Sequence, residues 1–319
     1  MKKLSYILLV LLSVLLVGCG KTTVTNNSVD IPTKIDLEVA SPSGAPAIVF
    51  YNHLNEEKVE INSQANNVIA YLTSNSSKDI VVAPTNAGIQ AITKKNAPFK
   101  IAAVITFGNF FIITTGRDQD NEMNEGDKVL AFQENGVAGL IYKYLYGDKG
   151  LDTTYLADVQ AVRTEVLTNE NLDYDYIFLA QPVVSAVLSQ KKGFGIYTNS
   201  QMDYQNKTNG LSITQAAIFV SNNADQAKVD LFLKMIKKEI EELKENPDTL
   251  SLKTIDVSDE AFASKLAGTK TLITTLIENG NQIGIGFEYA YNYKESIDSF
   301  ITTLGLESTN EEIYWRPQN

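Results

Sequence analysis

The sequence is poor in the residues that form cross-links, metal sites and catalytic centres. Its 319 residues include one cysteine, one histidine and one tryptophan. A single cysteine allows no intramolecular disulfide, and one histidine is too few for the usual zinc ligand sets. The carboxylates that remain are scattered along the chain, so we expect no metal and no cofactor.

The lone histidine, His53, also gives little support for an enzyme. A catalytic pairing with Ser43 would require an acid and an oxyanion hole, and the chain contains no G-x-S-x-G turn. His53 stands between Asn52 and Leu54, where a packed or surface role is more common than a catalytic one. We therefore predict that the protein is not an enzyme.

Positive charge is scarce as well. The chain has 27 Lys and Arg residues against 38 Asp and Glu, a net charge of −11. Removal of Lys2 and Lys3 with a leader peptide would leave 25 basic residues and a net charge of −13. Such a surface repels nucleic acid and anionic lipid headgroups, so we expect no nucleic-acid partner.

No apolar run is long enough to span a bilayer. The run from Ile7 to Val17 follows MKKLSY, and these eleven residues are too few for a transmembrane helix. Two lysines before a short apolar run predict a secretory signal peptide. The next stretch, LLVGCGKTT, ends like a phosphate-binding loop, but Leu15 occupies the position that such a loop reserves for glycine.

The only cysteine, Cys19, directly follows Leu16, Val17 and Gly18. This segment resembles the lipobox of bacterial lipoproteins, in which cleavage precedes the cysteine and the thiol receives a diacylglycerol. The resemblance implies a signal peptide over 1–18 and a lipid anchor and linker over 19–33, with membrane contact through lipid alone. The alternative is an unmodified buried or free cysteine.

The rest of the chain alternates apolar runs with helical patterns, which is typical of an α/β protein with mainly parallel sheets. About 290 residues beyond the linker favour two domains. The expected strands are 35–40, 79–84, 100–106, 110–115, 128–132, 159–164, 176–180, 194–198 and 215–221. The expected helices are 66–72, 86–95, a long helix from a cap at Asn223 to about 246, 259–266, 271–278 and 296–304.

Four strand-to-helix junctions are candidate binding positions, because ligands of open α/β sheets bind beyond the carboxyl ends of the strands. They cover 40–47, 83–88, 132–139 and 179–185, and each would leave helix N–H groups free for a ligand's oxygens. In the competing interpretation, Ser43, Asn86, Asn135 and Gln181 only cap their own helices, which is the more common case for any single junction.

Taken in order, these segments resemble the solute-binding lipoproteins of ABC importers. The segments are SPSGAPAIVFYN, IVVAPTNAGIQAI, KIAAVITFGNFFIITTG, VLAFQENGVAGLIYKYL and IFLAQPVVSAVL, within about 34–305. The group resembled binds nitrate, sulfonates, taurine or thiamine precursors and has the periplasmic-binding-protein type II fold. The resemblance implies lobe one from 34–110 plus 220–319 and lobe two from 111–219, with crossover strands near 110–115 and 215–221.

The resemblance also implies a function. A monomer held on the extracytoplasmic face of the membrane, here a Gram-positive surface, would capture a small solute in a cleft between the lobes and deliver it to an ABC permease. The carried-over binding residues are Ser43, Gly44, Thr85, Asn86, Thr106, Phe107, Asn109, Glu134, Asn135, Gly136, Gln181 and Pro182. Phe107 would stack on a planar ligand or belong to the core.

The positions of the charged residues indicate which class of ligand to expect. The arginines are Arg117, Arg163 and Arg316, and none lies at a predicted junction. Glu134, at a helix start, would cap that helix or favour a ligand that donates hydrogen bonds. We therefore expect a neutral or weakly basic organic molecule, although backbone N–H groups alone can hold an oxyanion. A surface adhesin remains the alternative of a different class, with its binding face on the exterior.

Overall fold

The computed structural model describes residues 31–74, 77–117 and 122–317. The predicted signal peptide and Cys19 lie outside the described residues, as does most of the linker. Within the described ranges, no helix combines the length and apolarity that crossing a membrane requires.

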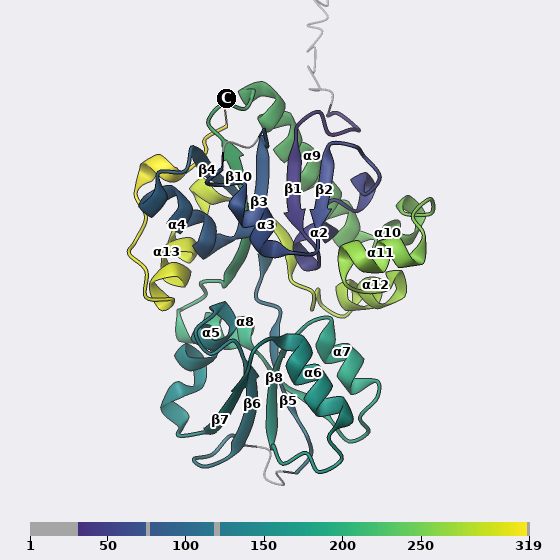
Figure 1. The fold of residues 1–319 in the computed structure, drawn as a ribbon, viewed down its shortest axis with the longest axis vertical. Helices are drawn as coiled ribbons and strands as arrows, with labels where there is room; N and C mark the ends of the chain where they lie inside the picture. The colour runs from purple at the N-terminus through teal and green to yellow at the C-terminus, as the bar shows by residue number, and fades with distance from the viewer. Residues whose placement is uncertain (1–30, 75–76, 118–121, 318–319) are drawn as a thin grey trace, which may run out of the picture. The chain divides into compact units, whose positions relative to one another are not determined.

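A six-stranded sheet forms the first half of the fold, with the strand order β11-β4-β10-β3-β1-β2 (Figure 1). Its buried strands are rich in Ile, Val and Ala because helices cover both faces. The strands are β1 (Val39–Pro42), β2 (Val59–Asn62), β3 (Ile80–Pro84), β4 (Phe99–Phe107), β10 (Thr214–Ser221) and β11 (Ile285–Tyr289).

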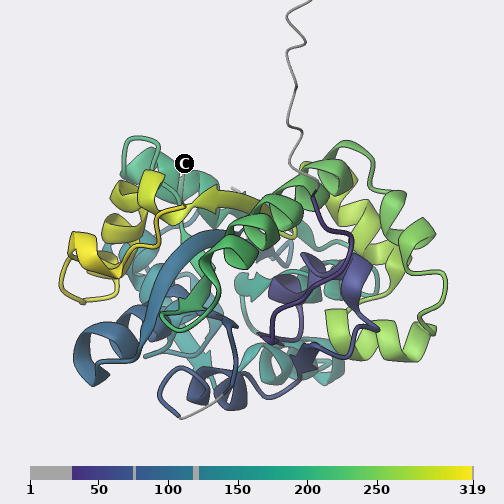
Figure 2. The same ribbon diagram turned by 90° about the horizontal axis from the view of Figure 1, so that it is seen from above.

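One face of this sheet packs against α9, and the other packs against α3, α4 and α13 (Figure 2). Gly88 permits the close approach of α4 to β10, because a Cβ at this position would lie 2.0 Å from the Phe219 ring. The helices are α2 (Ala45–Ile48), α3 (Ala65–Ala70), α4 (Thr85–Lys95), α9 (Gln226–Glu245), α10 (Thr249–Lys253), α11 (Asp259–Leu266), α12 (Lys270–Glu278) and α13 (Lys294–Thr303).

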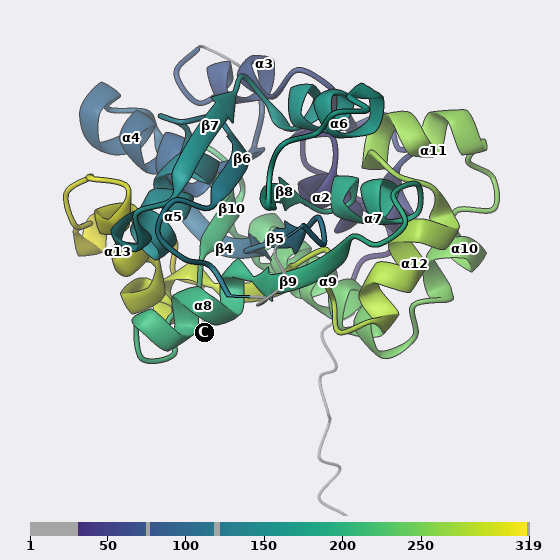
Figure 3. The same cartoon turned by 90° about the horizontal axis from the view of Figure 1, so that it is seen from below.

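A five-stranded sheet with the order β7-β6-β8-β5-β9 forms the second half, and four helices flank it (Figure 3). Its strands are β5 (Phe110–Thr114), β6 (Lys128–Phe132), β7 (Asp152–Leu156), β8 (Tyr176–Ala180) and β9 (Gly195–Asn199). Its helices are α5 (Val137–Tyr146), α6 (Val159–Thr168), α7 (Val183–Leu188) and α8 (Ser200–Lys207).

Both sheets are mixed rather than purely parallel. In the six-stranded sheet β1 to β4 share one direction, whereas β10 and β11 run against them. In the five-stranded sheet only β5 runs against its neighbours. The reversed β5 is the first strand that the chain forms in the five-stranded sheet, and the reversed β10 is the first strand after the chain returns to the six-stranded sheet. The predicted two-lobed α/β fold is confirmed.

Two short segments carry the chain between the sheets. The first, Gly108 and Asn109, joins β4 to β5, and the second, 208–213, joins α8 to β10. The expected crossovers at 110–115 and 215–221 therefore begin just after the connecting segments. From Thr214 onward the chain already pairs within the six-stranded sheet.

Some local predictions are wrong. Residues 159–164 form the start of α6 rather than a strand, because Asp158 caps the helix by accepting from the N–H groups of Gln160 and Ala161. The expected strand at 35–40 is displaced to Val39–Pro42. The long helix α9 is capped by Asp225 rather than Asn223, and the edge strands β2 and β7 and the strand β11 were not predicted.

Candidate functional site

The site is built around the point where β3 ends and α4 begins. Pro84 is the N-cap residue of α4, and it offers no side-chain acceptor to the helix. Because the N–H groups of a first helical turn have no intrahelical partner, those at the start of α4 are left for another group. The first helical residue, Thr85, is fully buried.

Buried side-chain oxygens without hydrogen-bond partners gather near this point. Eight such atoms occur among the described residues, and six of them lie close to where β3, β4 and β10 meet the connecting segments. The six belong to Thr85, Asn86, Thr106, Asn109, Thr214 and Gln215. The other two, from Thr274 and Asn281, lie on α12 and on the segment that follows it.

The strand register explains why residues so far apart in sequence meet here. Ala216 on β10 pairs with Pro84 on β3 and with Thr106 on β4. Thr214 pairs with Phe107 at the same edge of the sheet. The end of β3, the end of β4 and the beginning of β10 therefore form one polar edge.

The chemistry of this edge is neutral and suited to hydrogen bonding. Threonine hydroxyls both donate and accept, and amide oxygens accept. A buried polar atom left without a partner costs about 1–3 kcal/mol, so several at one place are not explained by stability. The edge is therefore the candidate site for a polar ligand.

Helix capping by the predicted side chains is seen at only one of the four junctions. The helices α2, α4, α5 and α7 have no side-chain hydrogen bond at their N-caps. The helices α6, α8, α9, α11 and α12, by contrast, are each capped by a side chain. The role as caps that we considered is thus absent for Ser43, Asn86 and Asn135, whereas Gln181 accepts from the N–H of Ser185 in the first turn of α7 at 3.2 Å.

At the first junction, the backbone N–H groups are already used. Ser43 donates its N–H to the carbonyl of Asn62 at 3.0 Å, and Gly44 donates to the carbonyl of Lys265 at 3.0 Å. Gly44 adopts a positive φ of 93°, which favours glycine. Ser43 and Gly44 are half-buried, and neither belongs to the group of unpartnered oxygens.

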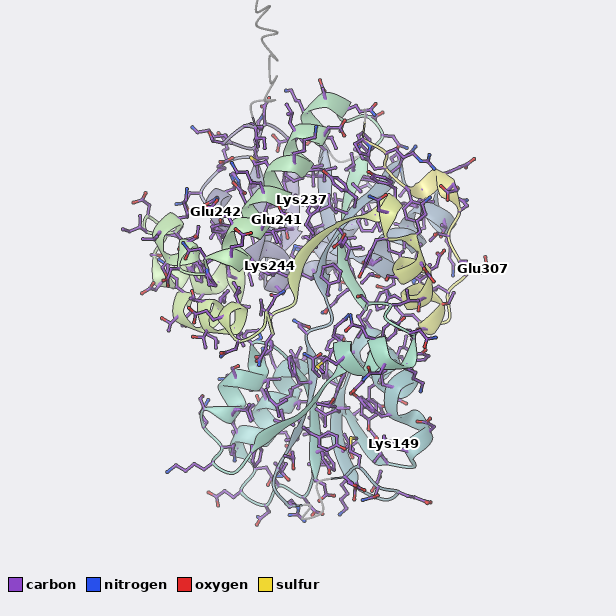
Figure 4. The ribbon with its side chains drawn as sticks, turned by 180° about the vertical axis from the view of Figure 1, so that it is seen from behind. Lys149, Lys237, Glu241, Glu242, Lys244 and Glu307 are labelled. Carbon is purple, nitrogen blue, oxygen red and sulfur yellow. The ribbon has the colours of Figure 1, made fainter. Side chains whose placement is uncertain are left out.

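Phe107 packs at the margin of the core. Its half-buried ring meets Tyr293 edge to face, with the ring centroids 6.0 Å apart, and it covers Gly286. The ring lines a cavity of about 470 Å³ together with Gln201 and residues of α9 and β11. Thr85, Thr106 and Thr214 do not line this cavity. Figure 4 labels Glu241 and Lys244, two of the α9 residues that border it.

In the five-stranded lobe, the predicted residues Glu134 and Asn135 are exposed and Gly136 is half-buried. Glu134 accepts a hydrogen bond at 3.1 Å from Lys143 of α5, the helix that follows it, so its charge is balanced locally. Gly136 is the N-cap of α5 and supplies no side-chain acceptor. The start of α5 therefore resembles that of α4 but lacks the buried oxygens.

Gln181 joins the two lobes. Its Nε2 donates to Oε1 of Gln282 at 3.1 Å, and its Oε1 accepts from the N–H and hydroxyl of Ser185. The amide of Asn109 donates to the Gln181 carbonyl at 3.2 Å. Gln181 is fully partnered and buried, whereas its neighbour Pro182 is half-buried.

The sequence did not point to Thr214 and Gln215. Both open β10, and their place beside Thr85 depends on the antiparallel pairing of β10 with β3, for which the sequence carries no local signal. Two of the three arginines are paired with acids rather than with residues of the polar edge: Arg117 binds Asp173, and Arg316 binds Glu311.

His53 is buried and lies between two carboxylates. It is 1% exposed, its Nδ1 lies 2.8 Å from Glu56 Oε1, and its Nε2 lies 3.0 Å from Glu239 Oε2. Burial opposes protonation, but the hydrogen bonds and charges of Glu239 and Glu56 outweigh it and raise the pKa of His53 above its usual value. No hydrogen bond links His53 to Ser43 among the described residues.

Comparison with known proteins identifies the fold. No protein-family model and no curated protein matches the chain. An ABC transporter structure from Parabacteroides distasonis matches with a TM-score of 0.69 at 16% identity, over 90% of this chain and 100% of that one. The aliphatic sulphonate binding protein SsuA from Escherichia coli matches with a TM-score of 0.60 at 14% identity, over 88% and 97%.

A third structure agrees with these two. The alkanesulfonate-binding protein SsuA from Xanthomonas axonopodis pv. citri, bound to MOPS, matches with a TM-score of 0.57 at 12% identity, over 89% of this chain and 99% of that one. The protein thus has the two-lobed fold of periplasmic binding proteins, and the resemblance stated from the sequence is confirmed at the level of the fold.

Proposed function

We propose that the protein is a substrate-binding protein that captures a small organic solute between its lobes and delivers it to an ABC permease. The fold supports this role, because its solved neighbours include sulfonate-binding proteins. The observation that carries the proposal is the edge of six unpartnered buried oxygens. Solute atoms would supply the partners that these oxygens lack.

The proposed contacts come mainly from lobe one. Thr85, Asn86, Thr106 and Asn109 were predicted from the sequence, and Thr214 and Gln215 join them. The start of α5, with Glu134, Asn135 and Gly136, would close over the solute from lobe two. Ser43, Gly44 and Pro182 would shape the margin, Gln181 would hold the lobes together, and Phe107 is left out of the contacts.

The chemistry favours a neutral or weakly basic ligand that hydrogen-bonds. The six oxygens belong to hydroxyl and amide groups, and none belongs to a charged side chain. An anion would have to rely on the N–H groups at the starts of α4 and α5. A polar heterocycle with both donors and acceptors fits this edge better than nitrate or a sulfonate does.

We further propose that Cys19 carries lipid and that the chain acts as a monomer on the extracytoplasmic face of a Gram-positive membrane. The lobe boundaries proposed from the sequence, 34–110 plus 220–319 and 111–219, would move by a few residues, with lobe one resuming at Thr214. A tether of this kind keeps the solute-loaded protein near its permease.

The test is ligand-dependent thermal unfolding of residues 21–319. The panel contains thiamine precursors, nucleobases, taurine, alkanesulfonates, nitrate and amino acids. A ligand at one hundred times its Kd adds about 2.7 kcal/mol to the free energy of unfolding, which raises the melting temperature by several degrees. We expect a heterocycle to raise it, and a sulfonate or nitrate response would contradict the proposed ligand class.

A matched pair of variants ties any response to the site. Thr85→Val removes an unpartnered hydroxyl at the start of α4, and Thr93→Val removes a hydroxyl near the end of the same helix that donates to the Ile89 carbonyl. The ligand response should weaken only in Thr85→Val. A panel without any response, in a protein that carries no co-purified solute, would count against the function and raise the adhesin alternative to parity with it.

A further inference from the structure

The two connecting segments lie side by side where they leave the six-stranded sheet. Thr214, the first residue after the second segment, pairs with Phe107, the last residue before the first. A Cβ on Gly108 would lie 2.9 Å from Cδ1 of Ile213 and 2.9 Å from Oε1 of Gln201. Gly108 is therefore the residue that lets the two segments and Gln201 meet.

One side-chain atom binds both segments. Oε1 of Gln201 accepts from the backbone N–H of Gly108 at 3.2 Å and from the backbone N–H of Ile213 at 3.1 Å. Gly108 and Ile213 are 105 residues apart in sequence and belong to different segments. These N–H groups would otherwise be buried without a partner, because both residues are buried.

Gln201 is itself held in place by the start of α8. Asn199 accepts from the N–H of Gln201 at 2.8 Å, which fixes the first turn of the helix. One turn later, the buried Tyr204 places its hydroxyl 2.8 Å from Ser299 Oγ and 3.3 Å from Thr303 Oγ1, both on α13. The helix α8 flanks the five-stranded sheet, yet it is anchored to a helix of the six-stranded lobe.

The second segment has its own ties to the six-stranded lobe. The hydroxyl of Tyr293 donates to Ser212 Oγ at 2.8 Å, and the N–H of Ser212 donates to Ser296 Oγ at 3.3 Å. The ring of Tyr293 also meets Phe107 at the end of β4. The contacts around Gln201 thus form a closed ring through both segments, α8 and α13.

We propose that Gln201 is a positioning residue that fastens the two connecting segments together, so that they bend as one unit about α8 when the lobes move. This inference rests on the proposed function, because lobe movement is what the fastening would control. Without the bridging oxygen, each segment would bend independently and the separation of the lobes would vary more widely.

The chain offers variants that separate this role from simple packing. Gln201→Leu keeps the approximate volume and removes the acceptor, whereas Gln201→Glu keeps an acceptor oxygen at the same reach. Gln205→Leu is the matched control, because Gln205 lies one turn further on α8, borders the same cavity and makes no side-chain hydrogen bond among the described residues.

The first readout is amide hydrogen exchange of the full chain. Loss of the acceptor in Gln201→Leu should speed exchange at Gly108 and Ile213 about tenfold relative to the rest of β4 and β10. Gln201→Glu should restore the slow exchange, and Gln205→Leu should match the native protein. Unchanged exchange in Gln201→Leu would overturn the inference.

The second readout is the distance distribution between spin labels at Lys149 and Glu307, in a Cys19→Ser background that leaves no other thiol. Both residues are exposed, and Figure 4 labels one on each lobe. Without any ligand, Gln201→Leu should broaden this distribution and Gln201→Glu should return it to the native width. An equally narrow distribution in Gln201→Leu, or a broad one in Gln201→Glu, would refute the fastening role.

Two precautions keep the result decisive. Should Gln201→Leu not fold, Gln201→Asn replaces it, because the shorter amide does not reach both N–H groups and the same changes are expected. Neither readout uses a solute, so a failed ligand panel and a failed fastening role give different results and can be told apart.

Discussion

Two groups of buried polar side chains in the six-stranded lobe are built in opposite ways. His53 is a titratable side chain, and each of its ring nitrogens lies within hydrogen-bond distance of a carboxylate oxygen. The edge around Thr85, Thr106 and Thr214 is neutral, and its oxygens have no partner within the described chain. The two groups are similarly hidden from solvent but differ in whether the fold satisfies them.

The difference distinguishes side chains that stabilise the fold from side chains that we propose to bind a ligand. The contacts of His53 join the 3₁₀ helix Tyr51–His53 to α9, and Glu56 also accepts from the N–H of Ile35 near the beginning of the lobe. This group holds the lobe together. The six oxygens of the polar edge have no hydrogen-bond partner among the described residues, so we expect them to lower stability slightly and to serve the ligand. Four predictions test this contrast.

The largest effect should follow from His53→Ala. The side chains of Glu56 and Glu239 are 22% and 12% exposed, so removing the imidazole leaves two mostly buried carboxylates without their shared partner. We expect the free energy of unfolding to fall by about 3 kcal/mol, measured by urea denaturation at pH 6. A loss below about 1 kcal/mol would show that the group is not structural.

The pH dependence of the native protein should reveal the same group. Because the folded-state pKa of His53 is raised above the ordinary 6.5, its stabilisation is complete below that pH and is lost as the pH rises through the folded-state value. Urea denaturation from pH 6 to pH 9 should show this decline, and His53→Ala should flatten it. Equal slopes in the two proteins would count against the assignment.

Helix starts provide a smaller contrast. Asp225 accepts from the N–H of Lys228 at 3.1 Å and caps α9, whereas Asn86 caps nothing at the start of α4. Asp225→Ala should cost about 1 kcal/mol of unfolding free energy, and Asn86→Ala should cost little. Thermal denaturation of the two variants measures the difference, and an equal loss in both would mean that Asn86 has a structural role.

The smallest effect on stability should come from Thr106→Val. Replacing an unpartnered hydroxyl by a methyl group should change the free energy of unfolding by less than about 0.5 kcal/mol, or raise it. The same variant should weaken solute binding about tenfold, measured by titration calorimetry with the ligand found in the panel. Unchanged affinity would remove Thr106 from the site.

Much of the fold could be predicted because the local hydrophobic pattern of many segments matches the secondary structure that they adopt. The runs at 79–84, 128–132 and 176–180 are strands, and the periodic segment up to Glu245 is a helix. The pattern failed at α6, where Val159, Val162 and Val166 have helical spacing but their β-branched composition suggested a strand. The strands β2 and β7 lie at sheet edges and carry polar residues, so their apolar signal is weak.

The candidate site was predicted only in part, for a physical reason. Thr85 and Asn86 follow a strand directly, which is visible in the sequence. Thr214 joins them through antiparallel pairing over a long separation, and Gln201 meets Gly108 across 93 residues. Contacts between residues so far apart in sequence depend on the tertiary structure. The exposure of Glu134 depends on how the turn before α5 packs, which the sequence does not show either.

The most direct measurement is a crystal structure of the protein with the ligand that the panel identifies. The account predicts that the solute lies at the end of β3, β4 and β10, with polar atoms within about 3.5 Å of at least three of the six oxygens that now lack partners. A solute bound elsewhere, or one that leaves Thr85, Thr106 and Thr214 without contact, would contradict it.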